Sequence, residues 1–482
     1  MLCRSNGATI RDERKRKNTM ATGKLTSPSP DDAQTLKRVK WGVVVGSALE
    51  WFDFYLFASM AALVFGRVFF SSASPALATL AAFSTFAVGF IVRPIGGVVF
   101  GVLGDKLGRK SVLTITFLLM GGSSVLIGLV PSYNSIGIAA PILLVVLRIF
   151  QGMGAGAEGA TAAVLAYEHA KTGHQGRQAA WPALGANIGL FASSLAIVGL
   201  TSLDRDFLDT WGWRIPFVAS ILLVGFGFWI RRNLPETPEF EQIATDVQKK
   251  QNTLHTVRDL LRSNWRAVAV VLVFTLGYNG ASYTFKTFSL SYLTQFRDVA
   301  ANVGAFGVTL ASACAIITIP AAGRLSDRFG SKRILVFGAV GTAVLAFPFF
   351  WLLNSGQPIY IWAGFILTTG IVIPATFAAC GSYLAGQFPA HVRVSGFSIG
   401  REVGGAFAGG LAPLIALSMV TMSATNATWG VSLLFVGCAV GIAIACIFDQ
   451  TRNAARQSSR LQVTEDADVD IDEQELAPHS AR

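Results

Sequence analysis

Charged residues are scarce in this sequence: they make up 14% of its 482 positions, against about 25% in average proteins. Hydrophobic residues reach 52%, and there are 49 glycines as well. A chain with so little charge cannot cover a surface that faces water, so much of it must face another solvent. This composition fits neither a soluble enzyme nor a disordered scaffold.

The motifs of metal, redox and nucleotide chemistry are also missing. The five cysteines have no paired or metal-ligand spacing, so we expect no disulfide framework and no metal site. The five histidines all fall in predicted loops or tails, which excludes a histidine relay inside a membrane. No phosphate-binding G-x-x-x-x-G-K-[ST] loop, HExxH or nucleophile-elbow motif is present. We expect no cofactor and no enzymatic activity.

Apolar runs of bilayer-crossing length, about 20 residues, are abundant. Twelve can be drawn, at 41–65, 77–100, 111–130, 138–167, 179–200, 213–230, 267–293, 303–322, 334–353, 359–385, 396–420 and 428–447. The fourth is too long for a simple span, so we expect it to tilt or to project from the membrane.

The net charge of +11 follows the predicted topology. The predicted outer loops contain few basic residues, namely Arg67, Arg205 and Arg297, whereas the short inner loops 101–110 and 323–333 are rich in them. Basic loops favour the cytoplasmic side, so both termini are predicted there. The charge then reflects topology and contact with anionic lipid, and no nucleic-acid partner is expected.

Polar segments divide the chain into predicted domains. Residues 1–40 form a polar cytoplasmic tail with the run RDERKRK, and they include no signal-peptide-like segment. We favour a solvated tail over a lipid-binding or nuclear-type segment, and Met20 is an alternative start. A cytoplasmic linker, 231–266, separates six-helix bundles at 41–230 and 267–447. Residues 448–482 form an acidic tail that is predicted to be disordered.

Internal repetition supports the six-plus-six division. GDKLGRK at 104–110 returns as SDRFGSK at 326–332, each after the second span of its bundle. Gly185, Asn187 and Gly189 are echoed by Gly400, Glu402 and Gly404. Such paired echoes indicate a duplicated unit, as in many secondary transporters.

The twelve spans and the repeated loop resemble the major facilitator superfamily of secondary transporters. Within it, the chain resembles the metabolite:proton symporters, which include proline/betaine, shikimate, citrate and 2-oxoglutarate carriers. The resemblance covers about residues 41 to 447 and is carried by EWFDF (50–54), RPIGGVVFGVLGDKLGRK (93–110), RIFQGMGAGAEGA (148–160) and WGWRIPF (211–217). It implies an all-α membrane fold of twelve transmembrane helices in two pseudo-symmetric six-helix bundles. It also implies proton-coupled transport across the cell inner membrane by a functional monomer.

The chain departs from the family pattern at several positions. Ala157 replaces the second glycine of a Gly-Gly-Glu run, and Gln387 replaces a frequent glutamate. Arg401 and Glu402 stand where uncharged residues are common in the family, and Lys286 is not a residue that the family shares. The C-terminal half therefore leaves the substrate open.

Charges inside the predicted spans point to the transport site, because each costs at least about 2.5–3.5 kcal/mol to insert. By helical rise, Asp53 lies about 18 Å from the inner end of its span and Arg148 about 15 Å deep from the outer end, so the two can meet. We predict that Asp53 binds the proton, with Arg148 as the partner that favours its deprotonated form. Glu50 shares a helical face with Asp53 and is assigned to the same site. The alternative is a permanent structural ion pair.

A second set of residues is assigned to substrate binding. Arg93 precedes a proline and can turn its guanidinium toward a carboxylate. Tyr278, Asn279 and Tyr283 are predicted to line the cavity or, alternatively, to form ordinary bonds between helices. Lys286, predicted near the outer mouth, either attracts anions or extends to the interface. Arg401 binds substrate or belongs to a structural network on the cytoplasmic side.

A third set is assigned to gating. Glu158 is predicted to latch onto the basic loop of Lys106, Arg109 and Lys110, or, alternatively, to bind the proton directly. Asp105 would hold the first loop, and by repetition Asp327 the second. Gly104, Gly108 and Gly330 would allow these loops to turn tightly.

The sequence predicts proton-coupled import of a small polar metabolite by alternating access. An organic acid anion is favoured because of the arginine and lysine residues predicted to be buried. A zwitterion such as proline or betaine, drug:proton antiport and a non-transporting sensor are the alternatives.

Overall fold

A computed structural model describes residues 30–71, 74–107, 109–156, 159–168, 170, 173–232, 253–389, 392–423, 427–451 and 453. Within these ranges the regular structure is helical throughout, with no strand. By backbone contacts the chain divides into two compact units, Met1–Trp41 and Gly42–Arg482. Of the first unit only the start of helix α2 is described. All contacts discussed below lie within the second.

The helices fall into two groups along the chain. The N-terminal group comprises α2 (Pro30–Met60), η1 (Ala61–Phe65), α3 (Gly66–Phe69), α4 (Pro75–Ile91), α5 (Arg93–Leu107), α6 (Arg109–Leu129), α7 (Tyr133–Ile136), α8 (Ala139–Ala155), α9 (Gly159–Glu168), α10 (Gln175–Ala179), α11 (Trp181–Thr201), α12 (Arg205–Phe207), η2 (Leu208–Gly212) and α13 (Arg214–Arg232). The C-terminal group comprises α15 (Thr253–Tyr283), η4 (Thr284–Phe288), α16 (Ser289–Phe296), α17 (Ala301–Phe329), α18 (Ser331–Asn354), α19 (Pro358–Phe365), η5 (Ile366–Val372), α20 (Ile373–Ala385), α21 (Arg393–Thr421) and α22 (Trp429–Ile447). The segments labelled η are π-helical, a geometry that often marks functional positions.

Each predicted span falls on a helix or on consecutive helices. Among the described residues, nine helical stretches are long and apolar enough to cross a membrane, and two shorter apolar helices lie at Thr114–Leu129 and Ala139–Ala155. The sixth predicted span, 213–230, falls on α13. The all-α membrane fold is thereby confirmed. The fourth predicted span falls on two helices, α8 up to Ala155 and α9 from Gly159, and residues 157 and 158 between them lie outside the described residues.

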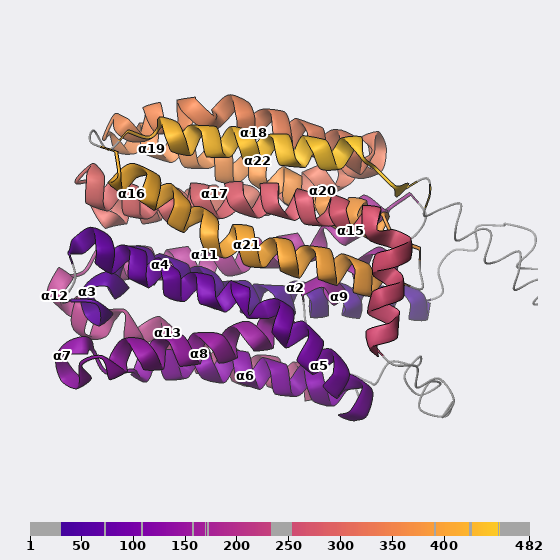
Figure 1. Ribbon diagram of the computed structural model, residues 1–482, viewed down its shortest axis with the longest axis horizontal. Coiled ribbons are helices and arrows are strands. Elements are labelled where there is room, and N and C mark those ends of the chain that lie inside the picture. The colour runs from indigo at the N-terminus through magenta and orange to yellow at the C-terminus, as the bar shows by residue number, and fades with distance from the viewer. Residues whose placement is uncertain are drawn as a thin grey trace, which may run out of the picture. The chain divides into compact units, whose positions relative to one another are not determined.

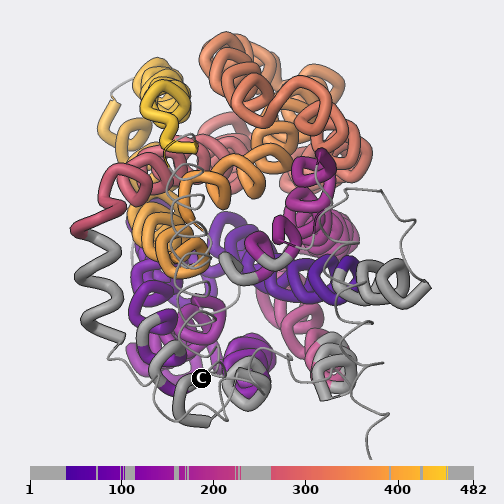
Figure 2. Tube along the Cα trace, turned by 90° about the vertical axis from the view of Figure 1, so that its right-hand side faces the viewer, coloured from indigo at the N-terminus to yellow at the C-terminus, as the bar shows by residue number. Residues whose placement is uncertain are grey.

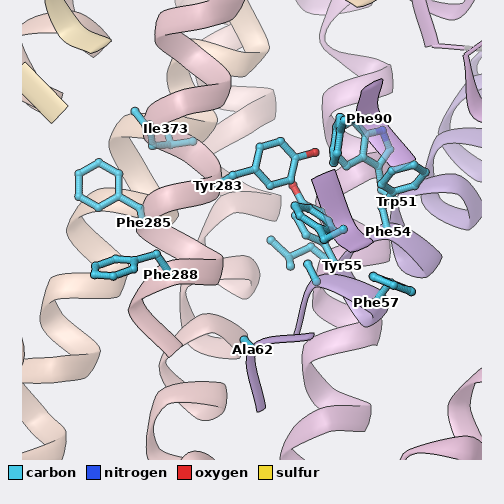
Figure 3. Close-up of a cluster of buried hydrophobic side chains, with 14 of the residues drawn as sticks. Trp51, Phe54, Tyr55, Phe57, Ala62, Phe90, Tyr283, Phe285, Phe288 and Ile373 are labelled. Atoms are coloured by element: carbon cyan, nitrogen blue, oxygen red, sulfur yellow. The ribbon is translucent and has the colours of Figure 1, made fainter. Parts of the chain in front are cut away.

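The long helices lie side by side (Figure 1). Viewed along them, most of the N-terminal helices lie on one side and most of the C-terminal helices on the other (Figure 2). The two groups meet where α11 packs on α17, and where α21 packs on α4, α5 and α9. Aromatic and aliphatic side chains from both groups form one buried cluster, which extends from Trp51 on α2 to Phe288 on η4 (Figure 3).

The glycine echo found in the sequence has a packing role. A side chain on Gly185 or Gly189 of α11 would meet the backbone carbonyls of Val44 and Ala48 on α2. A β-carbon on Gly400 or Gly404 of α21 would first meet the side chain of Val271 or Thr275 on α15, at 2.8 Å, and then the carbonyl of Val268 or Leu272, at 3.1 or 3.0 Å. Small residues permit such close backbone approach between membrane helices. The repeat therefore preserves one helix contact in each group.

Candidate functional site

A small cavity of about 60 Å³ lies between the two groups of helices. Four charged residues line it: Glu50 and Arg93 from the N-terminal group, and Arg401 and Glu402 from the C-terminal group. The rest of its wall includes Trp51, Phe90, Thr275, Tyr278, Asn279, Phe377 and Cys380. A larger cavity, of about 820 Å³, lies among α15, α21 and α22, but its lining is almost wholly apolar. Only the smaller of these two cavities offers the charges that recognise a polar molecule.

Arg93 is the centre of the charge network in this cavity. One terminal nitrogen of its guanidinium lies 2.6 Å from Glu50 Oε1, and its Nε lies 3.0 Å from Glu402 Oε2. Glu402 Oε1 in turn lies 3.5 Å from the Arg401 guanidinium. Two acids and two bases balance in charge, as buried charges must if they are to be tolerated. The Arg93–Glu402 pair joins the two groups of helices.

Asp53 lies inside the N-terminal group and does not line the cavity. Its Oδ2 accepts a hydrogen bond of 2.7 Å from the Ser124 hydroxyl, which accepts one of 2.6 Å from the Gln151 amide. Gln151 Oε1 accepts a hydrogen bond from Arg148. The predicted direct pair of Asp53 and Arg148 is therefore not formed among the described side chains. Ser124 and Gln151 connect them instead. Gln151 lies one helical turn after Arg148 and accepts a hydrogen bond from its guanidinium.

Aromatic rings surround the Arg148 guanidinium. Its carbon lies 4.2 Å from the centroid of the Phe57 ring and 4.5 Å from that of Phe54. The Arg93 guanidinium carbon lies 4.8 Å from the same Phe54 centroid. Gly89 leaves room for this guanidinium, since a β-carbon there would overlap its present position. Phe54 thus contacts both the cavity arginine and the arginine of the Asp53 chain, and Figure 3 shows it among the rings of this cluster.

Lys286 is buried, with 4% of its surface exposed, so of its two alternatives the one in which it extends to the interface is wrong. Its ammonium donates a hydrogen bond of 3.3 Å to the Tyr55 hydroxyl, and it lies over the Tyr55 ring. Among the ion pairs of the described residues, none includes Lys286. The π-helical turn η4 carries this residue. Packing against α2 accounts for its burial, which depth along the helix alone did not predict.

The predicted substrate residues divide into two sets. Arg93, Tyr278, Asn279 and Arg401 line the cavity, together with Glu50, which was assigned to proton coupling. Tyr283 and Lys286 do not line it. Tyr283 instead makes ring contacts with Trp51, Tyr55 and Phe90 and so lies behind the cavity wall.

Asp327 connects the two groups at the end of the bundle that contains Lys332 and Arg393, here called the basic end. Its Oδ1 accepts hydrogen bonds from the backbone N–H groups of Gly176 (2.7 Å) and Arg177 (3.2 Å). At the same end, Arg393 lies 2.8 Å from Glu168. These contacts hold α17 and α21 against the segment α9–α10.

The glycine turn predicted for the second loop is present at Gly330, between α17 and α18. Its φ of 87° belongs to the left-handed region, which favours glycine. Of the first loop, Gly108 lies outside the described residues, as do the side chains of Asp105 and Arg109 and the surroundings of Gly104. Glu158 lies outside them as well. The Glu158 latch therefore stays a prediction.

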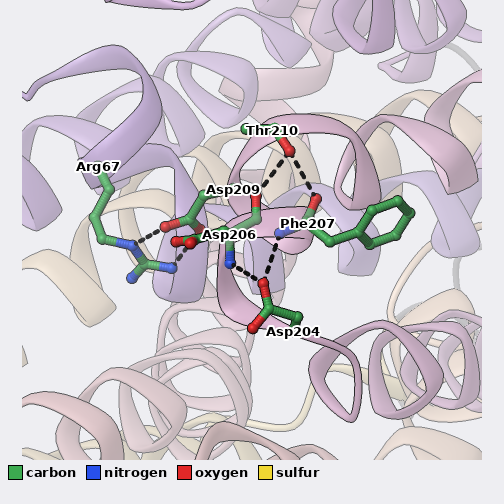
Figure 4. Close-up of polar contacts among 6 residues, drawn as sticks. All are labelled: Arg67, Asp204, Asp206, Phe207, Asp209 and Thr210. Carbon is green, nitrogen blue, oxygen red and sulfur yellow. Dashed lines mark hydrogen bonds and ion pairs between the residues drawn. The ribbon is translucent and has the colours of Figure 1, made fainter.

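The opposite end of the bundle also carries contacts between the two groups. Ser291 on α16 donates a hydrogen bond of 3.1 Å to the Ala62 carbonyl, and Gln295 donates one of 2.6 Å to Thr79 on α4. Arg67 makes two hydrogen bonds to Asp209 at this end, but both residues belong to the N-terminal group (Figure 4). Contacts between the two groups thus exist at both ends of the cavity.

Sequence reasoning missed several residues of this site. Gln151 follows Arg148 by three positions, so helical spacing could have identified it. The sequence does not indicate a role for Ser124, because serine is common in apolar helices. Phe54 and Tyr55 belong to a run of aromatic residues. Their individual contacts depend on how the helices pack and cannot be predicted from the sequence.

Comparison with known proteins identifies close relatives. A family model described as Major Facilitator Superfamily matches residues 43–413. The shikimate transporter of Escherichia coli K12 is 34% identical over 440 residues, which cover 89% of this chain and 99% of that protein. The proline/betaine transporter of the same strain is 31% identical over 431 residues, covering 88% of this chain and 85% of that protein.

Two further matches concern the membrane and the fold. The inner membrane metabolite transport protein YhjE of E. coli K12 is 36% identical over 387 residues, which cover 78% of this chain and 86% of that protein. The crystal structure of a D-xylose-proton symporter superposes with a TM-score of 0.65 at 16% identity, covering 85% of this chain and 96% of that one. At that identity the likeness shows the fold alone.

Proposed function

The chain belongs to the Major Facilitator Superfamily, in its metabolite:proton symporter branch, and from this premise we propose that it imports a small organic acid anion together with a proton. Its relatives transport small metabolites and are not enzymes, and the chain is a transporter of the same kind. One observation carries the choice of an anion: Arg93 and Arg401 approach the same cavity from opposite groups of helices. A guanidinium fork binds a carboxylate through two hydrogen bonds.

A zwitterion is the second candidate substrate, as the name of the proline/betaine transporter suggests. The cavity offers it Glu50 and Glu402 for a positive group, beside the rings of Trp51 and Tyr278. Aromatic faces and carboxylates together suit a quaternary ammonium. The anion is favoured because Nε of Arg93 and NH1 of Arg401 have no aligned hydrogen-bond acceptor among the described residues, so two guanidinium donors remain for a carboxylate.

We assign proton binding to Asp53. It is buried in the N-terminal group, and one of its carboxylate oxygens has no hydrogen-bond partner among the described residues. The Ser124–Gln151 chain leads from its other oxygen to Arg148. Arg148 and the substrate-binding Arg93 share the Phe54 ring, so an anion bound to Arg93 would change the field around the Asp53 chain.

Alternating access would move residues 41–230 against residues 267–447, with 231–266 as the linker. The cavity supports such a motion because about 60 Å³ is far less than the roughly 300–1,000 Å³ of typical ligand pockets. It must widen to admit a metabolite. Release of the Asp327 contacts would open the basic end, and release of the Ser291 and Gln295 contacts would open the other. Gly104, Asp105, Gly108, Arg109, Glu158 and Gly330 complete the proposed gating set.

We place the basic end in the cytoplasm of a cell with the chain in its inner membrane, both termini on the cytoplasmic side. The basic residues of the inner loops support this orientation. Protons and the metabolite are then taken up from outside, by a functional monomer in contact with lipid.

Uptake by proteoliposomes tests the proposal. Purified protein is reconstituted, an acid-outside gradient is imposed, and labelled shikimate, dicarboxylates, proline and betaine are offered while internal pH is recorded. Saturable uptake of a carboxylate with internal acidification is expected. Uptake of proline or betaine alone would favour the zwitterion, and alkalinisation on addition of drug-like cations would indicate antiport.

A further inference from the structure

We propose that Glu402 acts as an internal substitute for the substrate, occupying Arg93 until the carboxylate of the transported anion displaces it. This inference rests on the proposed function. It gives Glu402 the role of competing with the substrate carboxylate for Arg93. Glu402 is 6% exposed and lies on α21, one position after Arg401, facing Arg93 of α5 across the boundary between the two groups. It is a carboxylate already bound where a substrate carboxylate would bind.

The two carboxylates on Arg93 are held differently. Glu50 accepts a hydrogen bond of 2.6 Å from a terminal nitrogen of the guanidinium. Glu402 lies 3.0 Å from Nε, yet this nitrogen has no aligned hydrogen-bond acceptor among the described residues. A charged contact without the hydrogen-bond geometry is the weaker of the two. Glu402 is therefore the partner that an incoming carboxylate replaces, and Glu50 is the one that stays.

Arg401 provides a place for the displaced carboxylate. Its guanidinium lies 3.5 Å from the other oxygen of Glu402, and its NH1 atom also has no hydrogen-bond acceptor among the described residues. A small shift of Glu402 toward Arg401 would satisfy this donor. Glu402 then keeps a counter-charge throughout, which avoids the large cost of an unpaired buried charge.

The exchange couples substrate binding to movement of the helices. The Arg93–Glu402 ion pair joins α5 to α21, and a carboxylate bound to Arg93 would break it. The two groups could then separate around a cavity that is otherwise too small for a metabolite. A neutral molecule of the same shape cannot compete for Arg93, so the ion pair also selects for charge.

Exchange measurements on the Glu402→Gln variant test this inference. The amide no longer competes for Arg93, so the KM for counterflow of the anion should fall about tenfold, the factor equal to roughly 1.4 kcal/mol. The probe is labelled shikimate, or, if the wild type does not take it up, the carboxylate with the fastest uptake in the panel above. The neutral methyl ester of the probe should compete weakly with its exchange, and equally so in wild type and variant.

Two control variants complete the design. Glu402→Asp keeps the carboxylate and should restore a KM near that of wild type. Asp209→Asn makes the same kind of change at the Arg67 pair outside the cavity and should leave the KM unchanged. A Glu402→Gln protein that folds, exchanges the anion and has an unchanged or higher KM would overturn the inference alone. If wild-type protein transports none of the carboxylates, the proposed function fails as well.

Discussion

Phe54 contacts both Arg93, which we propose binds the substrate, and Arg148, the arginine of the chain that we propose binds the proton. Arg93 and Arg148 both lie within cation–π distance of its ring, at 4.8 and 4.5 Å. Two buried cations near one ring repel each other, and the negative face of the ring lowers the cost of keeping them there. A carboxylate on Arg93 would offset part of this repulsion, which is a direct physical route from substrate to the Asp53 chain.

The Phe54→Leu variant should therefore weaken the coupling of transport to the proton gradient more than it weakens binding of the anion. Leucine keeps an apolar side chain at the position but removes the ring face, which is worth about 2 kcal/mol to a desolvated cation. We expect anion counterflow to persist while uptake driven by the proton gradient falls severalfold. Both rates are measured in the same proteoliposomes. Phe54→Tyr retains the ring and serves as the control, and equal losses of counterflow and driven uptake in Phe54→Leu would argue against a coupling role.

The Asp53→Asn variant should abolish uphill uptake and leave exchange of preloaded substrate intact. The amide cannot release a proton, but it can still accept the hydrogen bond from Ser124. Counterflow and gradient-driven uptake are compared at equal protein density in the membrane. Uphill accumulation by this variant would show that the proton binds elsewhere.

The burial of these charged residues was predictable from the sequence, but their partners were not. Asp53 and Arg148 were identified because buried charge is costly, and helical rise placed them at similar depth. Rise gives no information on which way each side chain points, so the intervening Ser124 and Gln151 were missed. The burial of Lys286 against Tyr55 was missed for the same reason.

At the scale of helices, contacts between backbones explain why glycine recurs where it does. Hydrophobic length alone predicted the position of the spans, because the membrane sets it. Gly185 and Gly189 on α11 and Gly400 and Gly404 on α21 were visible only as an echo in the sequence. Their partners on α2 and α15 could not be predicted, since packing between distant segments depends on the folded arrangement.

A substitution at one of these contacts should destabilise the protein. In Gly185→Ala the new β-carbon would overlap the Val44 carbonyl, so the helices must separate, at a cost of about 1–3 kcal/mol. Thermal unfolding in detergent should show a lower midpoint than wild type. Gly199→Ala is a matched control, because it lies on the same helix in open space. Similar midpoints for the two variants would mean that the α2–α11 contact is loose.

At the scale of the molecule, contacts between the two groups of helices are present at both ends of the bundle. Asp327 bridges them at the basic end through the backbone of Gly176 and Arg177. Gln295 and Ser291 bridge them at the other. Alternating access requires that one set of contacts breaks while the other holds, so each set should control access to the cavity from its own side.

Cys380 provides a measurement of that access, because it lines the cavity and is only 8% exposed. In a protein with Cys380 as its only cysteine, Asp327→Ala should raise the rate of maleimide labelling from the basic side, since the backbone N–H groups lose their acceptor. Gln295→Ala should raise it from the opposite side instead, because its bond to Thr79 is lost. A membrane-impermeant maleimide applied to each face of the proteoliposomes separates the two rates. If either variant accelerated labelling equally from both sides, the two ends would not act as separate gates, and the bridging contacts would serve only to hold the bundle together.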